Sequence, residues 1–141
     1  MPRYLADSSI WGWANSGHRP DITTKLAERY EAGQVVTCPP VVLEVLHRAR
    51  TGQQYETLIE TLFKPLDWLP LGNEQSLRAV AVQRELAATT HGNHPKPAID
   101  YLIAAVAESA ADDETLLWFF HKDLLIICEH TGQPFDAESP T

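Results

Sequence analysis

Short apolar runs alternate with amphipathic helical patterns along this chain, and this alternation restricts its fold more than any other feature. Residues 4–7, 34–37 and 115–120 are short, mostly apolar, and bounded by polar or turn residues, which is typical of buried strands. Strands separated by helices join into a parallel sheet through right-handed crossovers, with helices on both faces. The sequence therefore predicts an α/β fold with a central, mainly parallel sheet flanked by helices on both faces.

Helical periodicity fills most of the segments between these strands. Apolar residues recur every fourth position at Ile22, Leu26 and Tyr30, between a cap at Asp21 and a stop at Gly33. Further helices are predicted from Pro39 to a stop at Gly52, over residues 53–63, over residues 73–88 and from Pro97 onward. We expect a loop around Gly17 and Pro20, a short extended segment at residues 68–70, a turn at residues 90–97 and an edge segment or disordered tail at residues 132–141.

A length of 141 residues with 44% hydrophobic and 21% charged side chains fits one globular domain. We assign that domain to residues 1–135 and a short tail to residues 136–141. A chain of this size can bury a core without disulfides, so that Cys38 and Cys128 are expected to be free thiols. The longest apolar runs fall far short of the roughly 20 residues that cross a bilayer, and no signal peptide is evident, so that we expect a cytoplasmic protein that does not enter membranes.

The net charge of -8 taken alone argues against a nucleic-acid partner. The charge is uneven, however, because residues 98–141 hold nine acids and one base and the first 97 residues are neutral. Exposed charges are screened beyond about 10 Å, so that a local phosphate-facing patch remains open. Its candidate members are Arg48, Arg50, Arg78, Arg84 and Lys96.

Four acids stand where the predicted topology can bring them to one crevice. Asp7 and Asp123 follow strands, Glu44 lies in the second turn of a helix, and Asp100 lies in the first turn of another. Ligands of open parallel sheets bind at the carboxyl ends of the strands. Each acid also has a simpler explanation, such as a turn cap at Asp7 or Asp123, or an i,i+4 pair between Glu44 and Arg48.

Carboxylates that converge in this way need protons or a cation, because two of them roughly 5 Å apart repel by about 3 kcal/mol at an effective dielectric near 20. Hard oxygen ligands select Mg²⁺ or Mn²⁺, and such an ion can activate water against a phosphodiester. We expect Asp7, Asp100 and Asp123 to hold the metal, and Glu44 to bind it or position the water. The dipole of its helix is expected to keep Asp100 ionised, and Ser8 and Ser9 can hold a water or a carboxylate.

At these residues the chain resembles the PIN-domain ribonucleases, and among them the VapC-type toxins of type II toxin-antitoxin modules. The similarity runs from Arg3 to about Phe135. It is carried by residues 4–9, 38–46, 97–105, 121–123 and 129–134.

The resemblance implies a single PIN-like domain whose metal-binding and catalytic acids are Asp7, Glu44, Asp100 and Asp123. Ser9 matches the hydroxyl position that follows the first acid, and Arg48 is a candidate for contact with substrate or with the metal ligands. It also implies a Mg²⁺-dependent endoribonuclease, with Mn²⁺ as a substitute, acting on a structured RNA such as tRNA or rRNA. A homodimer and neutralisation by a cognate VapB-like antitoxin are implied as well.

The last motif departs from the family pattern. Members often continue from the last acid as Asp-x-Asp-Phe, whereas here Asp123 leads directly into residues 124–127, LLII. A fifth carboxylate is therefore missing, and with it a ligand for a second metal. This departure keeps open a second hypothesis, a catalytically weak or inactive PIN-fold module that binds RNA or protein.

Other sites have weaker support. His91 with His94, and Cys128 with His130, have local zinc-ligand spacing, yet no finger-like set of four exists, and we predict no further cofactor. No hydrolase serine elbow or nucleotide-binding glycine motif is present. His121 is open to a proton-transfer or a structural role, and Trp11 and Trp13 to a core role or to stacking on an unpaired base.

Overall fold

The computed structural model describes residues 1–89, 96–120 and 122–139. It contains a five-stranded sheet in the order β3-β2-β1-β4-β5, and every neighbouring pair is parallel. The strands are β1 (Arg3–Ala6), β2 (Val35–Thr37), β3 (Asp67–Trp68), β4 (Thr115–Phe119) and β5 (Phe135–Ala137). The predicted α/β class and parallel sheet are therefore confirmed.

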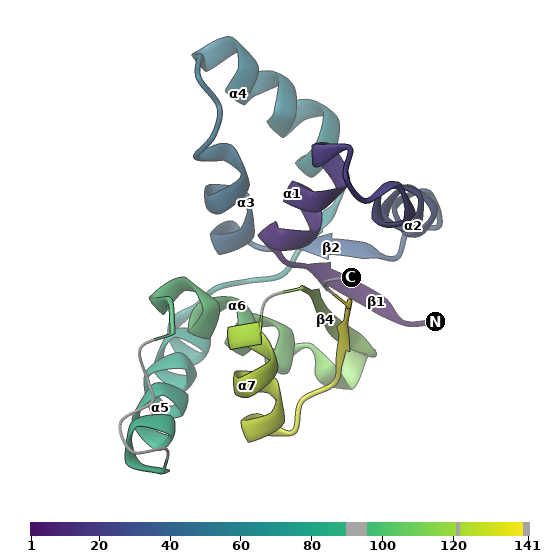
Figure 1. The fold of residues 1–141 in the computed structure, drawn as a ribbon. Helices are drawn as coiled ribbons and strands as arrows, with labels where there is room; N and C mark the ends of the chain where they lie inside the picture. The colour runs from purple at the N-terminus through teal and green to yellow at the C-terminus, as the bar shows by residue number, and fades with distance from the viewer. Residues whose placement is uncertain (90–95, 121, 140–141) are drawn as a thin grey trace.

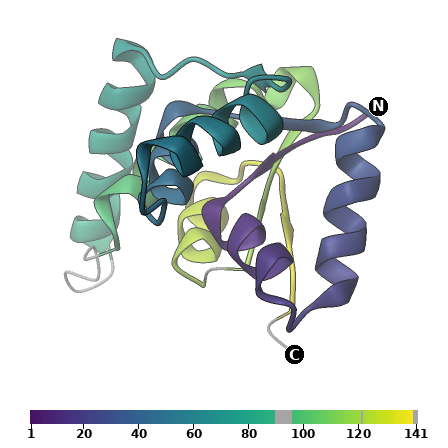
Figure 2. The same ribbon diagram turned by 90° about the horizontal axis from the view of Figure 1, so that it is seen from above.

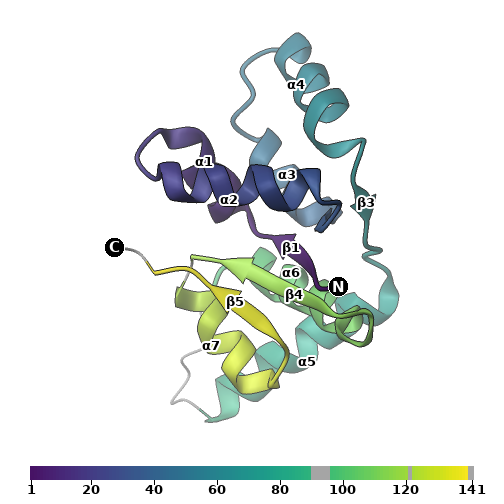
Figure 3. The same ribbon diagram turned by 90° about the vertical axis from the view of Figure 1, so that its right-hand side faces the viewer.

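Helices cover both faces of the sheet (Figures 1 and 3). They are α1 (Ser8–Ser16), α2 (Pro20–Glu31), α3 (Pro39–Leu46), α4 (Gly52–Leu58), α5 (Asn73–Thr89), α6 (Ala98–Ser109) and α7 (Lys122–Thr131). Helices α1, α2 and α3 lie on one side of the sheet, and α5, α6 and α7 lie on the other (Figure 3). Figure 2 shows α2 and α5 at opposite sides of the molecule. In the described part of the chain, no helix is long and apolar enough to span a membrane.

The core lies along β1 and β4, the two central strands. Leu5 pairs with Leu117 across the parallel register, and both side chains are fully buried. Trp118 is also fully buried and meets Tyr4 edge to face, with ring centroids 6.0 Å apart. Cys38 and Cys128 are buried free thiols, as expected from the sequence.

A helix stands where the sequence predicted a loop after the first strand. Asp7 caps α1 by accepting a hydrogen bond from the Ser9 amide, and Gly17 ends the helix at φ 79°. Ile10, Trp11 and Ala14 form its buried stripe. The loop prediction was wrong because three serines, a glycine and an asparagine give α1 a poor helical composition, which tertiary packing overrides.

The helix predicted from Pro39 to Gly52 is also divided differently. Helix α3 ends at Leu46, and Gly52 begins α4 instead of ending the earlier helix. Thr51 caps α4 by accepting from the Gln54 amide at 3.1 Å. The remainder of the predicted 53–63 helix becomes the π-helical turn η1 (Ile59–Phe63). A 3₁₀ turn, η2 (Ala111–Asp113), follows α6.

Helix α7 follows the aromatic strand, at a run of five apolar residues for which the sequence offered no clear period. Asp123 therefore lies in the first turn of a helix as well as beyond a strand end. Pro97, expected as the first residue of a helix, is the cap of α6. The predicted turn at residues 90–97 lies mostly outside the described residues, as do His91, His94 and His121.

The chain end continues the sheet beyond residue 135. Strand β5 pairs with β4 through Ala137, so that the predicted edge segment is observed. Glu138 accepts from the Trp118 indole at 3.1 Å and pairs with Lys25 at 2.8 Å. The Arg29 guanidinium lies 3.7 Å from the centroid of the Tyr4 ring and 3.0 Å from Asp136. Residues 136–138 thus tie α2 to the central strands.

We predict that a chain ending at residue 135 is less stable than the parent by about 2 to 4 kcal/mol, because it loses strand pairing and leaves the buried Trp118 indole without its acceptor. Urea unfolding followed by circular dichroism measures this difference. Glu129→Gln, which removes an exposed acid elsewhere, is the control. A truncated chain with the parental midpoint would show that residues 136–138 do not belong to the folded unit.

Candidate active site

The carboxyl ends of β1, β2 and β4 meet at one edge of the sheet, as parallel strands require. The Asp7 amide donates to the Trp118 carbonyl at 2.9 Å, which fixes the start of α1 against the end of β4. Helices α1, α3 and α7 all begin just after these strand ends. Their N-termini therefore surround one crevice.

Asp7 is 3% exposed and acts as the cap of α1. Its Oδ2 accepts from the Ser9 amide at 3.2 Å. Its Oδ1 is buried and has no hydrogen-bond partner among the described residues. A buried carboxylate oxygen without a donor is costly unless it has a partner, so that this atom is available to a cation.

Glu44 reaches the crevice from α3. Ser8 Oγ donates to Glu44 Oε1 at 2.8 Å, so that the serine holds a carboxylate, as one of its two expected roles. The alternative i,i+4 pair is not observed, because Arg48 has no ion-pair partner within 4.0 Å in the part of the chain that the structure describes. Glu44 therefore faces Asp7 and Asp100 instead of its own helix surface.

Asp100 lies in the first turn of α6 and is 6% exposed. Asp7, Glu44 and Asp100 each offer a carboxylate oxygen, and these three oxygens lie within 4.8 Å of one another. They come from the cap of α1 and from α3 and α6, so that only the tertiary fold unites them. These three hard oxygen donors, one of them from an acid whose Oδ1 has no hydrogen-bond partner among the described residues, fit a small divalent cation such as Mg²⁺ or Mn²⁺.

Burial, followed by the charges of Asp7, Glu44 and Asp123, raises the pKa of Asp100 to about 7. In the metal-free protein Asp100 is therefore only partly ionised at neutral pH, which is less than the helix dipole alone leads one to expect from the sequence. A dipole contributes about 0.3 to 1 kcal/mol, and burial beside three other acids outweighs it. A cation in the crevice would reverse this balance.

Asp123 lies beside the three carboxylates but does not belong to that trio. Lys96 Nζ lies 3.3 Å from Asp123 Oδ1, and their side chains are only 10% and 19% exposed. Asp123 still raises the pKa of Asp100 by its charge. Lys96, a candidate member of a phosphate-facing patch, is thus a counterion of Asp123.

Ser9 links the start of α1, at the crevice, to the end of β4. Its Oγ accepts a hydrogen bond from the Phe120 amide at 3.2 Å. This bond joins α1 to the end of β4, the same connection that the Asp7 amide makes. Ser9 therefore positions the first acid and is a supporting residue in this structure.

A groove of about 1180 Å³ opens from the acids along α1 and α3. Ser8, Gly12, Trp13 and Arg48 line it together with the trio. Arg48 Nη1 lies 4.0 Å from the point where a side chain on Gly12 would begin. The groove thus leads from an acidic end to a cationic and aromatic wall.

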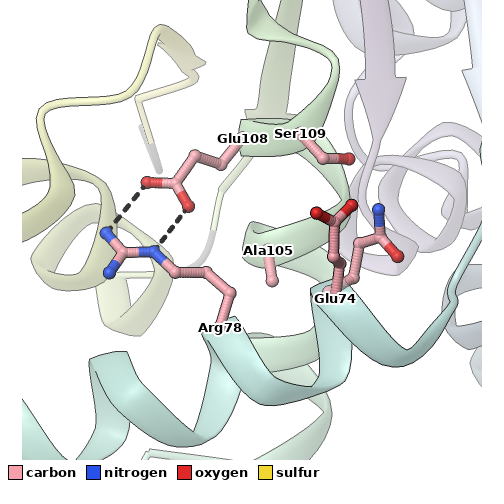
Figure 4. A pocket seen from close by; sticks show the side chains of 6 residues that line it. Glu74, Arg78, Ala105, Glu108 and Ser109 are labelled. Carbon is pink, nitrogen blue, oxygen red and sulfur yellow. Dashed lines mark hydrogen bonds and ion pairs between the residues drawn. The ribbon is translucent and has the colours of Figure 1, made fainter.

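The other candidates do not form sites in the described residues. His130 pairs with Glu85 at 2.9 Å, and Cys128 is buried, with its pKa raised to about 12 by burial. A second cavity of about 340 Å³ lies between α5 and α6, where Arg78 makes two hydrogen bonds to Glu108 (Figure 4). Arg78, a candidate member of the basic patch, is therefore paired with Glu108 within the protein.

The comparisons with known proteins agree with this geometry. The PIN domain family profile matches residues 4–125. The chain belongs to the PIN domain family. Ribonuclease VapC18 of Mycobacterium tuberculosis (strain ATCC 25618 / H37Rv) is 33% identical over 132 residues, which cover 93% of this chain and 91% of that protein. The predicted resemblance to VapC-type PIN ribonucleases, the ribonuclease components of toxin-antitoxin modules, is therefore confirmed at the level of the family.

Solved structures show the same PIN fold. The DNA-bound VapBC of Salmonella typhimurium superposes with a TM-score of 0.68 at 15% identity and covers 97% of this chain and 98% of its own. FitAcB from Neisseria gonorrhoeae gives a TM-score of 0.66 at 15% identity, covering 94% and 95%. At such low identity these matches support the fold alone.

Sequence reasoning missed two features of the site. The Lys96–Asp123 pair was not expected, although Lys96 directly precedes the proline that caps α6. The sequence did not predict that one side of α1 faces a groove, because this segment was predicted to be a loop. Ser8, Gly12 and Trp13 line the groove. Trp11 also borders it but is only 3% exposed and packs on Phe63 with ring centroids 4.9 Å apart.

We predict that the metal-free protein becomes less stable as pH rises from about 4 to 7. The folded state keeps the Asp100 proton up to a pKa of about 7, whereas the unfolded chain releases it near the ordinary value of 3.8. Asp100→Asn removes this loss, so that in EDTA its melting temperature should exceed that of the parent increasingly toward pH 8. Asp112→Asn removes an exposed acid and is the control. A constant difference from pH 4 to 8 would contradict the prediction.

Proposed function

We propose that this protein is a metal-dependent endoribonuclease, with Mg²⁺ as its metal and Mn²⁺ as a substitute. The observation that carries the proposal is the trio Asp7, Glu44 and Asp100, whose oxygens lie within 4.8 Å of one another in a PIN-domain chain. These three residues would hold the ion. When bound, it supplies positive charge that activates a water and stabilises charge on the attacked phosphate.

The protein side chains have distinct tasks in the proposed reaction. Asp7 and Asp100 offer buried oxygens, and Glu44, held by Ser8, accepts the proton of the attacking water. The water oxygen forms a bond to phosphorus while one bridging P–O bond breaks, and the leaving oxygen takes up a proton. Arg48, at the groove wall, attracts a neighbouring phosphate of the RNA.

The fourth acid has a separate role in this proposal. Asp123 was expected to bind metal, yet Lys96 occupies its Oδ1 side at 3.3 Å. We propose that Asp123 contributes negative charge to the crevice without binding the metal, and that Lys96 is the cation that balances the charge of Asp123. Together with the missing fifth carboxylate, this favours one metal ion per site.

Partners are proposed on the same basis. The similar solved structures include VapBC complexes, which supports a VapB-like antitoxin as the partner of this chain. An antitoxin segment carrying arginine would match the carboxylate trio in charge. A structured RNA such as tRNA or rRNA and a homodimer remain part of the proposal.

A second candidate function is a PIN-fold module that binds RNA or protein without cleaving it. The Lys96–Asp123 pair and the shortened last motif favour this alternative. Cleavage separates the two functions, since a binding module would retain RNA in EDTA and never cut it.

We predict that the purified protein cleaves RNA with Mg²⁺ or Mn²⁺ and that EDTA stops the cleavage. Asp100→Asn should reduce the rate by at least about a hundredfold, because one of three metal ligands loses its charge. Gel analysis of a labelled transcript measures the rate, and the matched control is Asp112→Asn. An Asp100→Asn variant that cleaves as fast as the parent would refute the assignment of the site.

We also predict that Lys96→Met binds Mn²⁺ about threefold to tenfold more tightly than the parent, because it removes a positive charge from the crevice. Calorimetric titration measures the affinity and the number of ions. Lys122→Met, which removes an exposed lysine on α7, is the control. Unchanged affinity in Lys96→Met would show that Lys96 does not act on the metal site.

A further inference from the structure

Trp13 is a large aromatic side chain that remains 40% exposed, although it belongs to a helix packed against the sheet. Trp11, two residues earlier on α1, is 3% exposed and contributes to the core. Trp13 lines the same groove as Asp7, Glu44 and Asp100. The fold therefore leaves an indole beside the acids, in contact with solvent.

Neighbouring side chains support this indole. Its ring lies on Phe120, with centroids 5.8 Å apart and an interplanar angle of 46°. The Arg19 guanidinium lies 5.1 Å from the centroid of Phe120. The Phe120 amide in turn donates to Ser9 Oγ, so that the aromatic pair is anchored at the strand end that carries Asp7. A supported ring loses little freedom when a planar ligand stacks on it.

The wall between the acids and Trp13 suits a nucleic-acid backbone. Gly12 lies in the middle of α1, where glycine destabilises a helix by about 1 kcal/mol relative to alanine. Because Gly12 has no side chain, the groove stays open at this position. Arg48 lies across from it with Nη1 4.0 Å from the position of an added Cβ. In the described part of the chain, this guanidinium has no ion-pair partner and is exposed. A phosphate is the group that best complements it.

The spacing along α1 fits a short piece of single strand. Trp13 is six residues beyond Asp7, about 9 Å along a helix that rises 1.5 Å per residue. A stacked strand advances about 3.4 Å per nucleotide. A phosphate at Asp7 would therefore be two or three nucleotides from a base at Trp13.

We propose that Trp13 is a stacking platform for an unpaired base of the RNA, two or three nucleotides from the cleaved phosphate, while Arg48 binds a phosphate between them. A base within a duplex has both faces covered, so that the platform selects single-stranded RNA at this position. This inference rests on the proposed function and adds the residue that recognises the substrate.

The test is a double-mutant cycle on RNA binding in EDTA, with gels to verify that the RNA stays intact. The probes are a fluorescein-labelled eight-nucleotide RNA and a series in which each position in turn is abasic. Trp13→Leu keeps an apolar side chain but removes the aromatic face, and Trp13→Phe keeps a smaller one. Trp68→Leu is the matched control, because Trp68 is 43% exposed and does not line the groove.

We expect Trp13→Leu to weaken binding of intact RNA by about fivefold to a hundredfold, and Trp13→Phe to retain most of the affinity. At one abasic position the parent and Trp13→Leu should bind equally, and Trp68→Leu should match the parent throughout. RNA should also quench the tryptophan fluorescence of the parent more than that of Trp13→Phe.

Equal binding by the parent and Trp13→Leu overturns the proposal, as does an equal loss in Trp68→Leu or the absence of RNA binding by the parent with and without Mg²⁺. A loss confined to binding of the cognate antitoxin also overturns it and assigns this end of the groove to protein. The proposed nuclease can fail separately. If the parent binds RNA through Trp13 but never cleaves it, the proposed nuclease activity is refuted and the stacking role of Trp13 stands. If the parent cleaves RNA and Trp13→Leu has no effect, the stacking role is refuted and the nuclease activity stands.

Discussion

Repulsion among the buried carboxylates is the constraint on which the rest of this structure depends. At a separation of 4.8 Å, two ionised carboxylates repel by about 3 kcal/mol at an effective dielectric near 20. Asp7, Glu44 and Asp100 each face two such neighbours, and Asp7 and Asp100 are almost inaccessible to water. A fold that keeps these groups together without a cation must protonate one of them, which is the state that the raised pKa of Asp100 describes.

The surrounding residues offset part of the repulsion among the acids but do not remove it. Ser8 and the Ser9 amide each donate to one acid, and Lys96 neutralises Asp123 at the margin. Among the described residues, none of these donors reaches Asp7 Oδ1. The crevice therefore remains deficient in positive charge at its centre, which is the physical basis for expecting a divalent ion there.

The groove extends this chemistry from the reacting centre to recognition. Helix α1 carries both functions, because its cap is Asp7 and its outer surface presents Gly12 and Trp13. Much of the chain's acidity lies in residues 98–141, whereas Arg48 comes from the neutral first part. A protein with a net charge of -8 can therefore still present a cation to a phosphate, because screening confines each contact to its own surroundings.

The sequence alone was sufficient for the α/β class and for the parallel sheet, because short buried strands and periodic helices are local patterns that side-chain burial imposes. The family was indicated separately, by the resemblance of the motifs around the four acids to those of PIN-domain ribonucleases. Segments with a weak or ambiguous local pattern were not recognised as helices. Helix α1 has a weak helical composition and was predicted to be a loop, and no helix was predicted at α7, which begins in an apolar run without a clear period. The sequence also identified the acids as candidates from their places at strand and helix ends. Which of them meet, that Lys96 pairs with Asp123, and that Trp13 faces the groove while Trp11 is buried were decided by the tertiary structure. These facts depend on distances between residues far apart in the chain, and on the rotation of each helix against the sheet, which no local pattern records.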